Sequence, residues 1–365
     1  MSDAPKNRPQ VGADVPGGAT NASHASSPPR TSATTSFAFV RQHAWLLGGI
    51  AALLAVNLFA DPAFLKLGWR DGHVFGVPVD ILLQGSRTTL LALGMTLVIA
   101  TGGVDLSVGS LVAIAGAVSA LLLNQGAGLF LTLAAALGVG VVGGAINGAL
   151  VARIGLQPIV ATLILMVAGR GVAQLISGGQ VIIFSHAGFE YLANGYLLGL
   201  PVAPLLVAAA FVGTHMLLRK TAAGLFIEAV GDNETASHFV GIAAARIKAL
   251  TYVFSGLCAG LTGVLTAANI RAADANRAGE NAELDAIFAV VVGGTALTGG
   301  RFTLLGTFLG AVLIQTLTTT MYYRGVPPAI APVPKAIVIV AVCLIQSEEL
   351  RARLRRFLPG AKGVA

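Results

Sequence analysis

A short polar segment, 101–110 (TGGVDLSVGS), interrupts a long apolar region and carries one aspartate and two serines. Its paired glycines break a helix, and Asp105 and Ser107 follow where short acceptor side chains satisfy the free backbone N–H groups of a new helix. Inside a bilayer an unpaired backbone group costs several kcal/mol. Asp105 and Ser107 are therefore expected either to cap this helix or to line a transport pathway.

A second polar segment, 219–248, is too polar to cross a membrane (RKTAAGLFIEAVGDNETASHFVGIAAARIK). Asp232 or Asn233 can cap a short helix within it, and Gly231 and Gly241 bound that helix. Three apolar residues of the helix share one face: Ala236, Phe239 and Val240. An amphipathic helix of this kind lies either against lipid headgroups or in the groove of a partner protein.

Catalytic and metal-binding motifs are absent from the sequence. No lysine follows a glycine, which excludes the phosphate-binding loop of an ATPase, and neither a zinc-protease helix nor a serine nucleophile elbow is present. The six histidines share no metal-ligand spacing, so no metal site is predicted. Only Asp105 and Asp285 approach the apolar stretches, which weakens the case for an ion-driven carrier without excluding it.

The composition indicates an integral membrane protein, because 55% of the 365 residues are hydrophobic and only 11% are charged. Membrane helices must therefore position the two polar segments. Ten apolar stretches can be counted: 44–60, 81–101, 104–124, 128–152, 156–176, 200–218, 249–268, 285–298, 303–322 and 331–346. The eighth and tenth are short for a span of about 20 residues. The prediction is an all-α integral membrane protein with about ten transmembrane helices.

The basic residues predict the orientation of these helices. Of the 23 Lys and Arg residues, fifteen fall on the side of the N-terminus and five on the opposite side, so both ends are expected in the cytoplasm. The net charge of +7 is spread over chain ends and short loops rather than a patch for nucleic acid. Three charges fall in or near spans, where they are functional, snorkel to an interface or pair with a carbonyl: Arg87, Arg170 and Lys335.

Small residues predict how the helices pack. Four G-x-x-x-G pairs occur in the apolar stretches, at 140/144, 144/148, 256/260 and 306/310, and such pairs let helix backbones approach closely in lipid. The TGG of 101–103 is followed by G-S, and that of 298–300 by G-T, at the same spacing. This similarity reflects either an internal duplication or the glycine chemistry shared by two helix turns.

Three stretches resemble the permease subunits of bacterial sugar-type ABC importers, which serve ribose, xylose, arabinose and related sugars. They are GMTLVIATGGVDLSVGSLVAIAGA (94–117), GLFIEAVGDNETASHFVGIAAARIKALTYVFSGLCAGLTGVL (224–265) and ELDAIFAVVVGGTALTGGRFTLLGTFLGAVLI (283–314). The resemblance extends over about 44–346. Two further stretches, 161–176 and 268–287, are most similar to galactofuranose permeases within that group.

The resemblance implies the partners of the chain. A second permease copy or a paralogue would complete the pathway, a periplasmic sugar-binding protein would deliver the sugar, and a cytoplasmic ATPase would bind ATP and Mg, so that this chain needs no cofactor. Within the coupling loop 219–248, residues 231–241 match the coupling element that docks into the ATPase. The residues expected to act there are Gly231, Asn233, Glu234, His238, Phe239 and Gly241. The outer loop residues Arg271, Asp274 and Asn276 are expected to contact the sugar or its binding protein, or simply to be solvated.

The predicted function is therefore that of a non-enzymatic permease subunit in the bacterial inner membrane, moving a monosaccharide to the cytoplasm by alternating access. The alternative is a secondary sugar transporter driven by an ion gradient. An enzyme acting on lipid-linked sugars would need a convergent acid–base or metal site, which the sequence does not offer. The expected organisation is a disordered tail over 1–40, a permease domain over 41–348 and a basic tail over 349–365.

Overall fold

A computed structural model describes residues 32–70 and 72–346 of the chain. The first helix begins at Ser32, before the end of the segment expected to be a disordered tail. Phe37, Phe39 and Val40 extend the apolar character of the following span toward the N-terminus, which explains the earlier start. The rest of that predicted tail, and the predicted C-terminal tail, lie outside the described residues.

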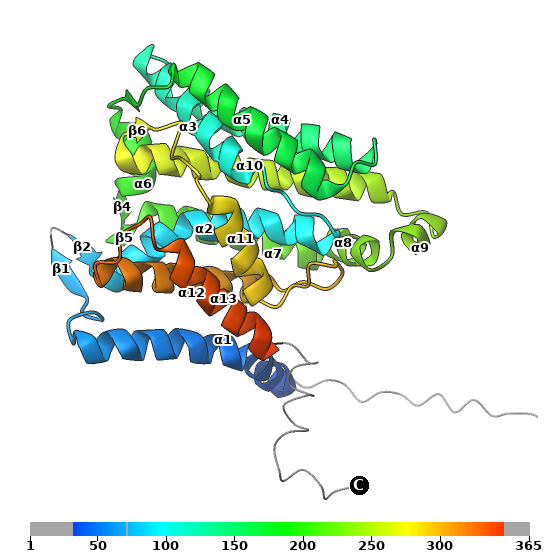
Figure 1. The fold of residues 1–365 in the computed structure, drawn as a ribbon, viewed down its shortest axis with the longest axis horizontal. Helices are drawn as coiled ribbons and strands as arrows, with labels where there is room; N and C mark the ends of the chain where they lie inside the picture. The colour runs from blue at the N-terminus through cyan, green and yellow to red at the C-terminus, as the bar shows by residue number, and fades with distance from the viewer. Residues whose placement is uncertain (1–31, 71, 347–365) are drawn as a thin grey trace, which may run out of the picture. The chain divides into compact units, whose positions relative to one another are not determined.

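Every one of the ten predicted apolar stretches carries a helix (Figure 1). They are α1 (Ser32–Ala60), α2 (Val77–Ala100), α3 (Val108–Asn124), α4 (Leu129–Ala152), α5 (Pro158–Ser177), α7 (Val202–Lys220), α10 (Ala244–Ile270), α11 (Ala282–Val292), α12 (Leu304–Tyr323) and α13 (Pro332–Gln346). Among the described residues, seven helices are long and apolar enough to cross a membrane: α1, α2, α4, α5, α7, α10 and α12. The all-α membrane fold is confirmed.

The eighth stretch differs from the prediction. It was expected to run from 285 to 298, but α11 ends at Val292 and the chain continues in turns until α12 begins at Leu304. Gly294, Gly299 and Gly300 have positive φ values of 93°, 91° and 92°, which a helix does not contain. The glycines therefore end the helix early and leave a short helix followed by a turn-rich segment.

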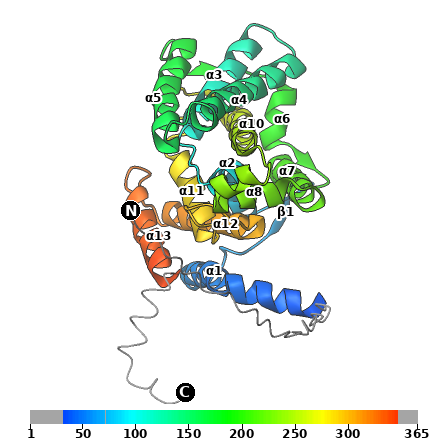
Figure 2. The same ribbon diagram turned by 90° about the vertical axis from the view of Figure 1, so that its right-hand side faces the viewer.

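Helix α10 is the centre of the bundle. It packs against α2, α3 and α4, while α5 covers α3, and α12 packs on α2 and α11. Figure 2 views the helices nearly end-on and shows α10 between the α3–α4–α5 group and the α2–α7–α12 group. An apolar core of buried residues from α2, α3, α10, α11 and α12 fills the space between these groups.

The predicted glycine pairs pack helices as expected. A Cβ atom on Gly140 would lie 2.1 Å from the carbonyl oxygen of Gly256, and a Cβ on Gly256 would lie 2.1 Å from that of Gly140. A Cβ on Gly310 would likewise lie 2.1 Å from the Ala289 oxygen. The glycines thus allow backbone contact between α4 and α10 and between α11 and α12, which confirms their predicted packing role.

The two ends of the bundle carry different small elements (Figure 1). One end holds three antiparallel strand pairs and the helix α6 (Ala187–Asn194). The pairs are β1 (Gly68–Arg70) with β2 (His73–Phe75), β3 (Ile182–Ile183) with β6 (Ala272–Ala273), and β4 (Tyr196–Leu197) with β5 (Leu200–Pro201). The opposite end holds two short helices, α8 (Ala223–Asp232) and α9 (Glu234–Phe239). We call these the strand end and the α8–α9 end.

Candidate functional site: a polar cavity and the α8–α9 segment

A cavity of about 1110 Å³ opens among the helices toward the strand end. It is lined by one face of α2, the last turns of α10, the loop that follows them, the start of α11 and the second half of α12. Its polar and charged lining residues are Asp80, Gln84, Arg87, Thr88, Thr262, Thr266, Asp274, Arg277, Glu280, Asp285, Gln315, Thr318, Thr319, Tyr322 and Tyr323. A cavity with so many hydrogen-bonding groups suits a polar solute rather than a lipid.

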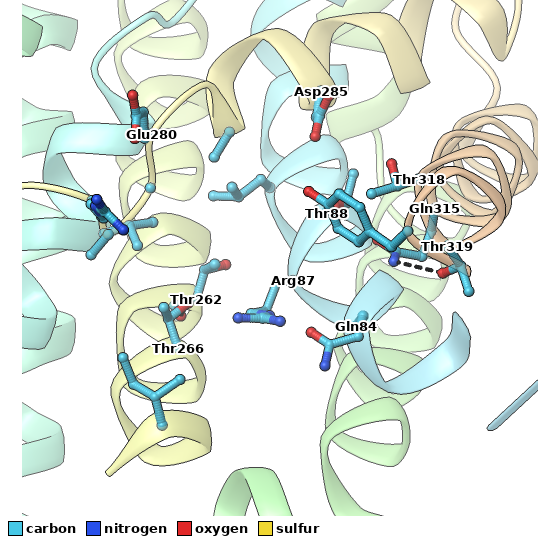
Figure 3. A pocket seen from close by; sticks show the side chains of 18 of the residues that line it. Gln84, Arg87, Thr88, Thr262, Thr266, Glu280, Asp285, Gln315, Thr318 and Thr319 are labelled. Atoms are coloured by element: carbon cyan, nitrogen blue, oxygen red, sulfur yellow. Dashed lines mark hydrogen bonds between the residues drawn. The ribbon is translucent and has the colours of Figure 1, made fainter. Parts of the chain in front are cut away.

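The face that α2 presents to the cavity follows from helical spacing. Asp80, Gln84, Arg87 and Leu91 are three or four residues apart, so they lie along one side of the helix. Figure 3 shows the Arg87 side chain extending from α2 into the space between Gln84 and Thr262 of α10. The cavity therefore places a guanidinium group among neutral amide and hydroxyl groups.

The three charges predicted in or near spans have different surroundings. The Arg170 guanidinium donates hydrogen bonds to the carbonyl oxygens of Ala275 (3.2 Å) and Ala278 (2.6 Å). The Lys335 ammonium group forms an ion pair with Asp285 at 2.9 Å. Arg87 has no such contact with any described residue. Pairing inside the bundle thus accounts for two of the three charges and leaves Arg87 to the cavity.

Tyr323, which lines the cavity near the strand end, forms a hydrogen bond to a residue outside the cavity. The Tyr323 hydroxyl, at the end of α12, donates a hydrogen bond to Asp61, which follows α1. This hydrogen bond lowers the pKa of the Asp61 carboxyl group. This hydrogen bond links the end of α12 to the segment that follows α1, so that segment also helps to position the rim of the cavity.

The cavity does not continue to the α8–α9 end. Below Leu91 and Val112 the helices meet in a buried apolar core that includes Met95, Ile99 and Leu111. At this depth, a hydrogen bond between the hydroxyl groups of Thr96 and Thr307, at 2.9 Å, links α2 to α12. Among the described residues, the cavity therefore lies in the strand-end half of the chain, and the α8–α9 half is closed by packed side chains.

Asp105 and Ser107 lie in the closed half and do not line the cavity. The Asp105 carboxylate is fully buried and accepts hydrogen bonds from the Ser107 backbone N–H (3.1 Å) and hydroxyl (2.6 Å). It also accepts from Asn147 of α4 (3.2 Å) and from Ser255 of α10 (2.9 Å). These bonds hold the start of α3 against two other helices, as a residue that organises a helix start would do.

The side chains of the three outer-loop residues have different partners. Arg271 adopts a positive φ of 55° and its guanidinium forms an ion pair with Glu190 of α6 at 3.0 Å. Asp274 lines the cavity and accepts backbone hydrogen bonds from Asn276 (3.0 Å) and Arg277 (3.2 Å). The Asn276 side chain accepts a hydrogen bond from Gln174 of α5 at 2.8 Å. Of the three, only Asp274 reaches the cavity.

The α8–α9 segment forms a compact exposed element. Of the two candidate caps, Asn233 is the one used, because its side chain accepts a hydrogen bond from the Ala236 N–H at 2.8 Å. Glu234 forms an ion pair with Lys248 of α10 at 2.5 Å, and Gly241 takes a positive φ of 86° that ends the element. His238 is exposed, and Phe239 and Val240 are 84% and 77% exposed. An apolar pair this exposed needs a surface to cover it.

Gly231 joins this element to the closed half of the bundle. A Cβ on Gly231 would lie 1.8 Å from the Ala100 oxygen, at the end of α2, and 2.5 Å from the Gly300 nitrogen. Gly300 in turn donates a hydrogen bond to Ala100 at 2.9 Å. Gly102 and Gly299 also approach closely, since a Cβ on Gly299 would lie 2.9 Å from the Gly102 nitrogen. The two TGG turns noted in the sequence therefore meet each other and α8.

Several cavity residues were not singled out from the sequence, notably Gln84, Thr262, Thr266, Gln315 and Thr319. A signal for them does exist, because polar residues recur at helical spacing within three apolar stretches: 84 and 87 (with 80 just before that stretch), then 262 and 266, then 315 and 319. In a membrane helix such a polar stripe predicts a face turned away from lipid.

Comparison with known proteins gives a consistent result. Residues 77–343 match the family described as the branched-chain amino acid transport system permease component. The chain is 47% identical to the galactofuranose transporter permease protein of Escherichia coli, over 87% of this chain and 91% of that protein. It is 37% identical to the fructose import permease protein of Bifidobacterium longum, over 88% and 94% of the two chains.

A third relative, the ribose import permease protein of Escherichia coli, is 36% identical over 84% of this chain and 95% of its own length. No solved structure matches the chain. The relatives are matched over nearly their whole length, so the similarity includes both the cavity-lining helices and the α8–α9 segment.

Proposed function

Since the chain belongs to the permease component family of the branched-chain amino acid transport system type, we propose that it is the membrane subunit of an ATP-driven sugar importer. The relatives named for galactofuranose, fructose and ribose support a monosaccharide as the transported solute. They support this function over the alternative of a gradient-driven carrier working alone. The chain is a transport subunit of the inner membrane, and ATP and Mg would be bound by a separate ATPase.

The observation that carries this proposal is the exposed apolar tip of the α8–α9 element. Phe239 is the last residue of a short helix that Asn233 caps and that the Glu234–Lys248 ion pair holds to α10. Val240 follows it, and both residues are exposed. A rigid helix with an exposed aromatic residue fits a groove on a partner protein. We assign this element the role of docking the ATPase, with Asn233, Glu234, His238, Phe239 and Gly241 shaping or forming the contact.

The mechanism we propose is alternating access. The strand-end half of the chain holds an open polar cavity, and the α8–α9 half is closed by apolar packing and by the glycine contacts at Gly231. If the α8–α9 end faces the cytoplasm, as the basic residues predict, the described conformation is open to the periplasm. ATP binding by the partner would then move α8, and Gly231 would pass this movement to α2 and to the turn before α12.

Other subunits complete the proposed pathway. A second copy of the chain or a paralogue would face the cavity, and a periplasmic sugar-binding protein would deliver the solute to the strand end. Asp274 is placed to meet a sugar that enters there, because it lines the cavity. Arg271 forms an ion pair with Glu190, and Asn276 accepts a hydrogen bond from Gln174. We therefore assign these two residues a role in shaping the loop that receives the binding protein.

The docking role is tested by replacing Phe239 with aspartate. A carboxylate at this position would have to be desolvated in the partner groove, and truncating an interface anchor of this type costs about 2 kcal/mol or more. We expect Phe239→Asp to insert normally but to lose the ATPase in a mild-detergent pull-down from its native membrane. The matched control is Phe239→Leu, which keeps an apolar side chain and should retain the ATPase.

The experiment reads out the bound ATPase by mass spectrometry and sugar uptake in the same cells. Wild-type recovery of a two-domain ATPase and wild-type uptake by Phe239→Asp would refute the docking role. A chain that is purified alone in its unaltered form, and that transports without ATP, would refute the proposed function itself.

A further inference from the structure

We propose that Arg87, together with Gln84, Thr262 and Thr266, forms a binding site for a neutral sugar inside the permease, partway along the cavity. This inference rests on the proposed function, since it names the contacts that the transported sugar makes within this subunit. It also goes further, because it gives the membrane subunit its own selectivity in addition to that of any binding protein.

Arg87 is the first reason for the proposal. A guanidinium group within a membrane helix is costly unless it is paired or hydrated, and its five N–H donors then call for acceptors. The other two charges in or near spans have such partners, in backbone carbonyls and in Asp285. Arg87 has none among the described residues, and Figure 3 shows its side chain in the open space of the cavity. The missing acceptors are those that a ligand would supply.

The neighbours of Arg87 supply the complementary acceptors. The Thr262 hydroxyl donates its proton to the Cys258 oxygen at 2.8 Å, and the Thr266 hydroxyl donates to the Thr262 oxygen at 2.7 Å. Both threonines line the cavity, and each hydroxyl oxygen keeps lone pairs that can accept a hydrogen bond. Gln84 adds an amide without a partner among the described residues. A sugar hydroxyl both donates and accepts, so it can bond to α2 on one side and to α10 on the other.

The charges around the cavity indicate that the ligand is neutral. Four carboxylates line it, from Asp80, Asp274, Glu280 and Asp285, against two guanidinium groups, from Arg87 and Arg277. Lys335 compensates Asp285, which leaves three carboxylates against two guanidinium groups. An anionic sugar would therefore meet like charges on its way to Arg87, and like charges next to one another are unfavourable in a poorly solvated site.

The site lies at the inner end of the cavity, where a sugar must pass before it reaches the closed half. Arg87 lies ten residues after Val77, where α2 begins, which corresponds to about 15 Å along the helix. Below it, Leu91 and Val112 mark the change from cavity to apolar core. A sugar held at Arg87 would thus rest just above the closed half, where opening of that half would release it inward.

The test uses the assembled transporter, with its ATPase and binding protein, in proteoliposomes. The probes are radiolabelled D-galactose, D-ribose, D-fructose and the anionic D-galacturonate. For the transported neutral sugar, Arg87→Met should raise the KM of uptake about tenfold or more, because charge-assisted hydrogen bonds are lost. Arg87→Lys should recover part of this loss, and Thr262→Val should raise the KM severalfold.

The matched control is Thr214→Val on α7. Thr214 is buried and its hydroxyl also bonds to its own helix, at the Ala210 oxygen, but it does not line the cavity. This variant should transport with the wild-type KM. Should Arg87→Met fail to assemble, Gln84→Cys gives a second measurement, in which the neutral sugar should slow labelling of the new thiol by a membrane-impermeant methanethiosulfonate.

The outcomes separate the two proposals. Failure of the unaltered transporter to import any probe with ATP would overturn the proposed function. ATP-driven import in which Arg87→Met and Thr262→Val keep the wild-type KM, or in which the sugar does not protect Gln84→Cys, would overturn the binding site alone. Preferential import of D-galacturonate would overturn its assignment to a neutral sugar.

Discussion

Replacing Gly231 with alanine should uncouple ATP hydrolysis from transport, because this glycine brings the backbone of α8 against the closed half of the bundle. The added Cβ would lie 1.8 Å from the Ala100 oxygen, whereas ordinary contact begins at 3.4 Å. Closing that difference requires α8 and the end of α2 to separate by about 1.6 Å, since neither neighbour is a flexible side chain. The Gly300 N–H bond to Ala100 would be strained by the same movement.

The cost of this separation can be estimated. Overpacking a tight contact costs about 1–3 kcal/mol. This cost should reduce the coupling energy between movement of α8 and movement of α2 by the same amount. A loss of about 1–3 kcal/mol of coupling energy weakens the coupling by about 5- to 150-fold. The number of sugar molecules imported per ATP should therefore fall by about 5- to 150-fold, while the ATPase still binds through Phe239.

The assay compares uptake of labelled sugar with phosphate release by the reconstituted transporter. Gly213→Ala is the matched control, because Gly213 also lies within a helix, α7, and a Cβ there would meet nothing within 4 Å. This control should keep the wild-type ratio of uptake to hydrolysis. A wild-type ratio in Gly231→Ala, with the ATPase bound, would show that the glycine contact does not transmit the movement.

Two further substitutions test the packing and the buried aspartate. Gly256→Ala places a Cβ 2.1 Å from the Gly140 oxygen, so it should destabilise the α4–α10 pair by about 1–3 kcal/mol and lower the melting temperature in detergent. The control is Gly138→Ala on α4, whose Cβ meets nothing within 4 Å and which should keep the wild-type melting temperature. Equal losses of stability in both variants would contradict the packing role. Asp105→Asn places an amide donor among partners that all donate to the carboxylate, so it should destabilise the chain by about 1–3 kcal/mol without changing the KM of the remaining uptake. A changed KM in a stable Asp105→Asn variant would instead favour a role in the pathway.

Much of the fold could be predicted because hydrophobicity and glycine spacing act locally. Each of the ten apolar stretches located a helix, and the G-x-x-x-G pairs marked positions where helix backbones meet, although not which helices they join. The end of α11 was missed, since an apolar run does not show where Gly294, Gly299 and Gly300 turn the chain.

The site was harder to predict because it depends on which helices meet. The exposed tip at Phe239 follows from a local pattern and was anticipated. The cavity was not, because Gln84 and Thr262 come together only through the packing of α2 on α10. Asp105 was conspicuous in the sequence, yet its partners Asn147 and Ser255 come from distant segments, so only the structure shows that the carboxylate is enclosed.

The most direct test of the account is transport by purified components. The chain, reconstituted in liposomes with its ATPase and binding protein, should import a neutral monosaccharide only when ATP is supplied, and should import none when the ATPase is omitted. Import by the chain alone, driven by an ion gradient and unaffected by Phe239→Asp, would contradict the account.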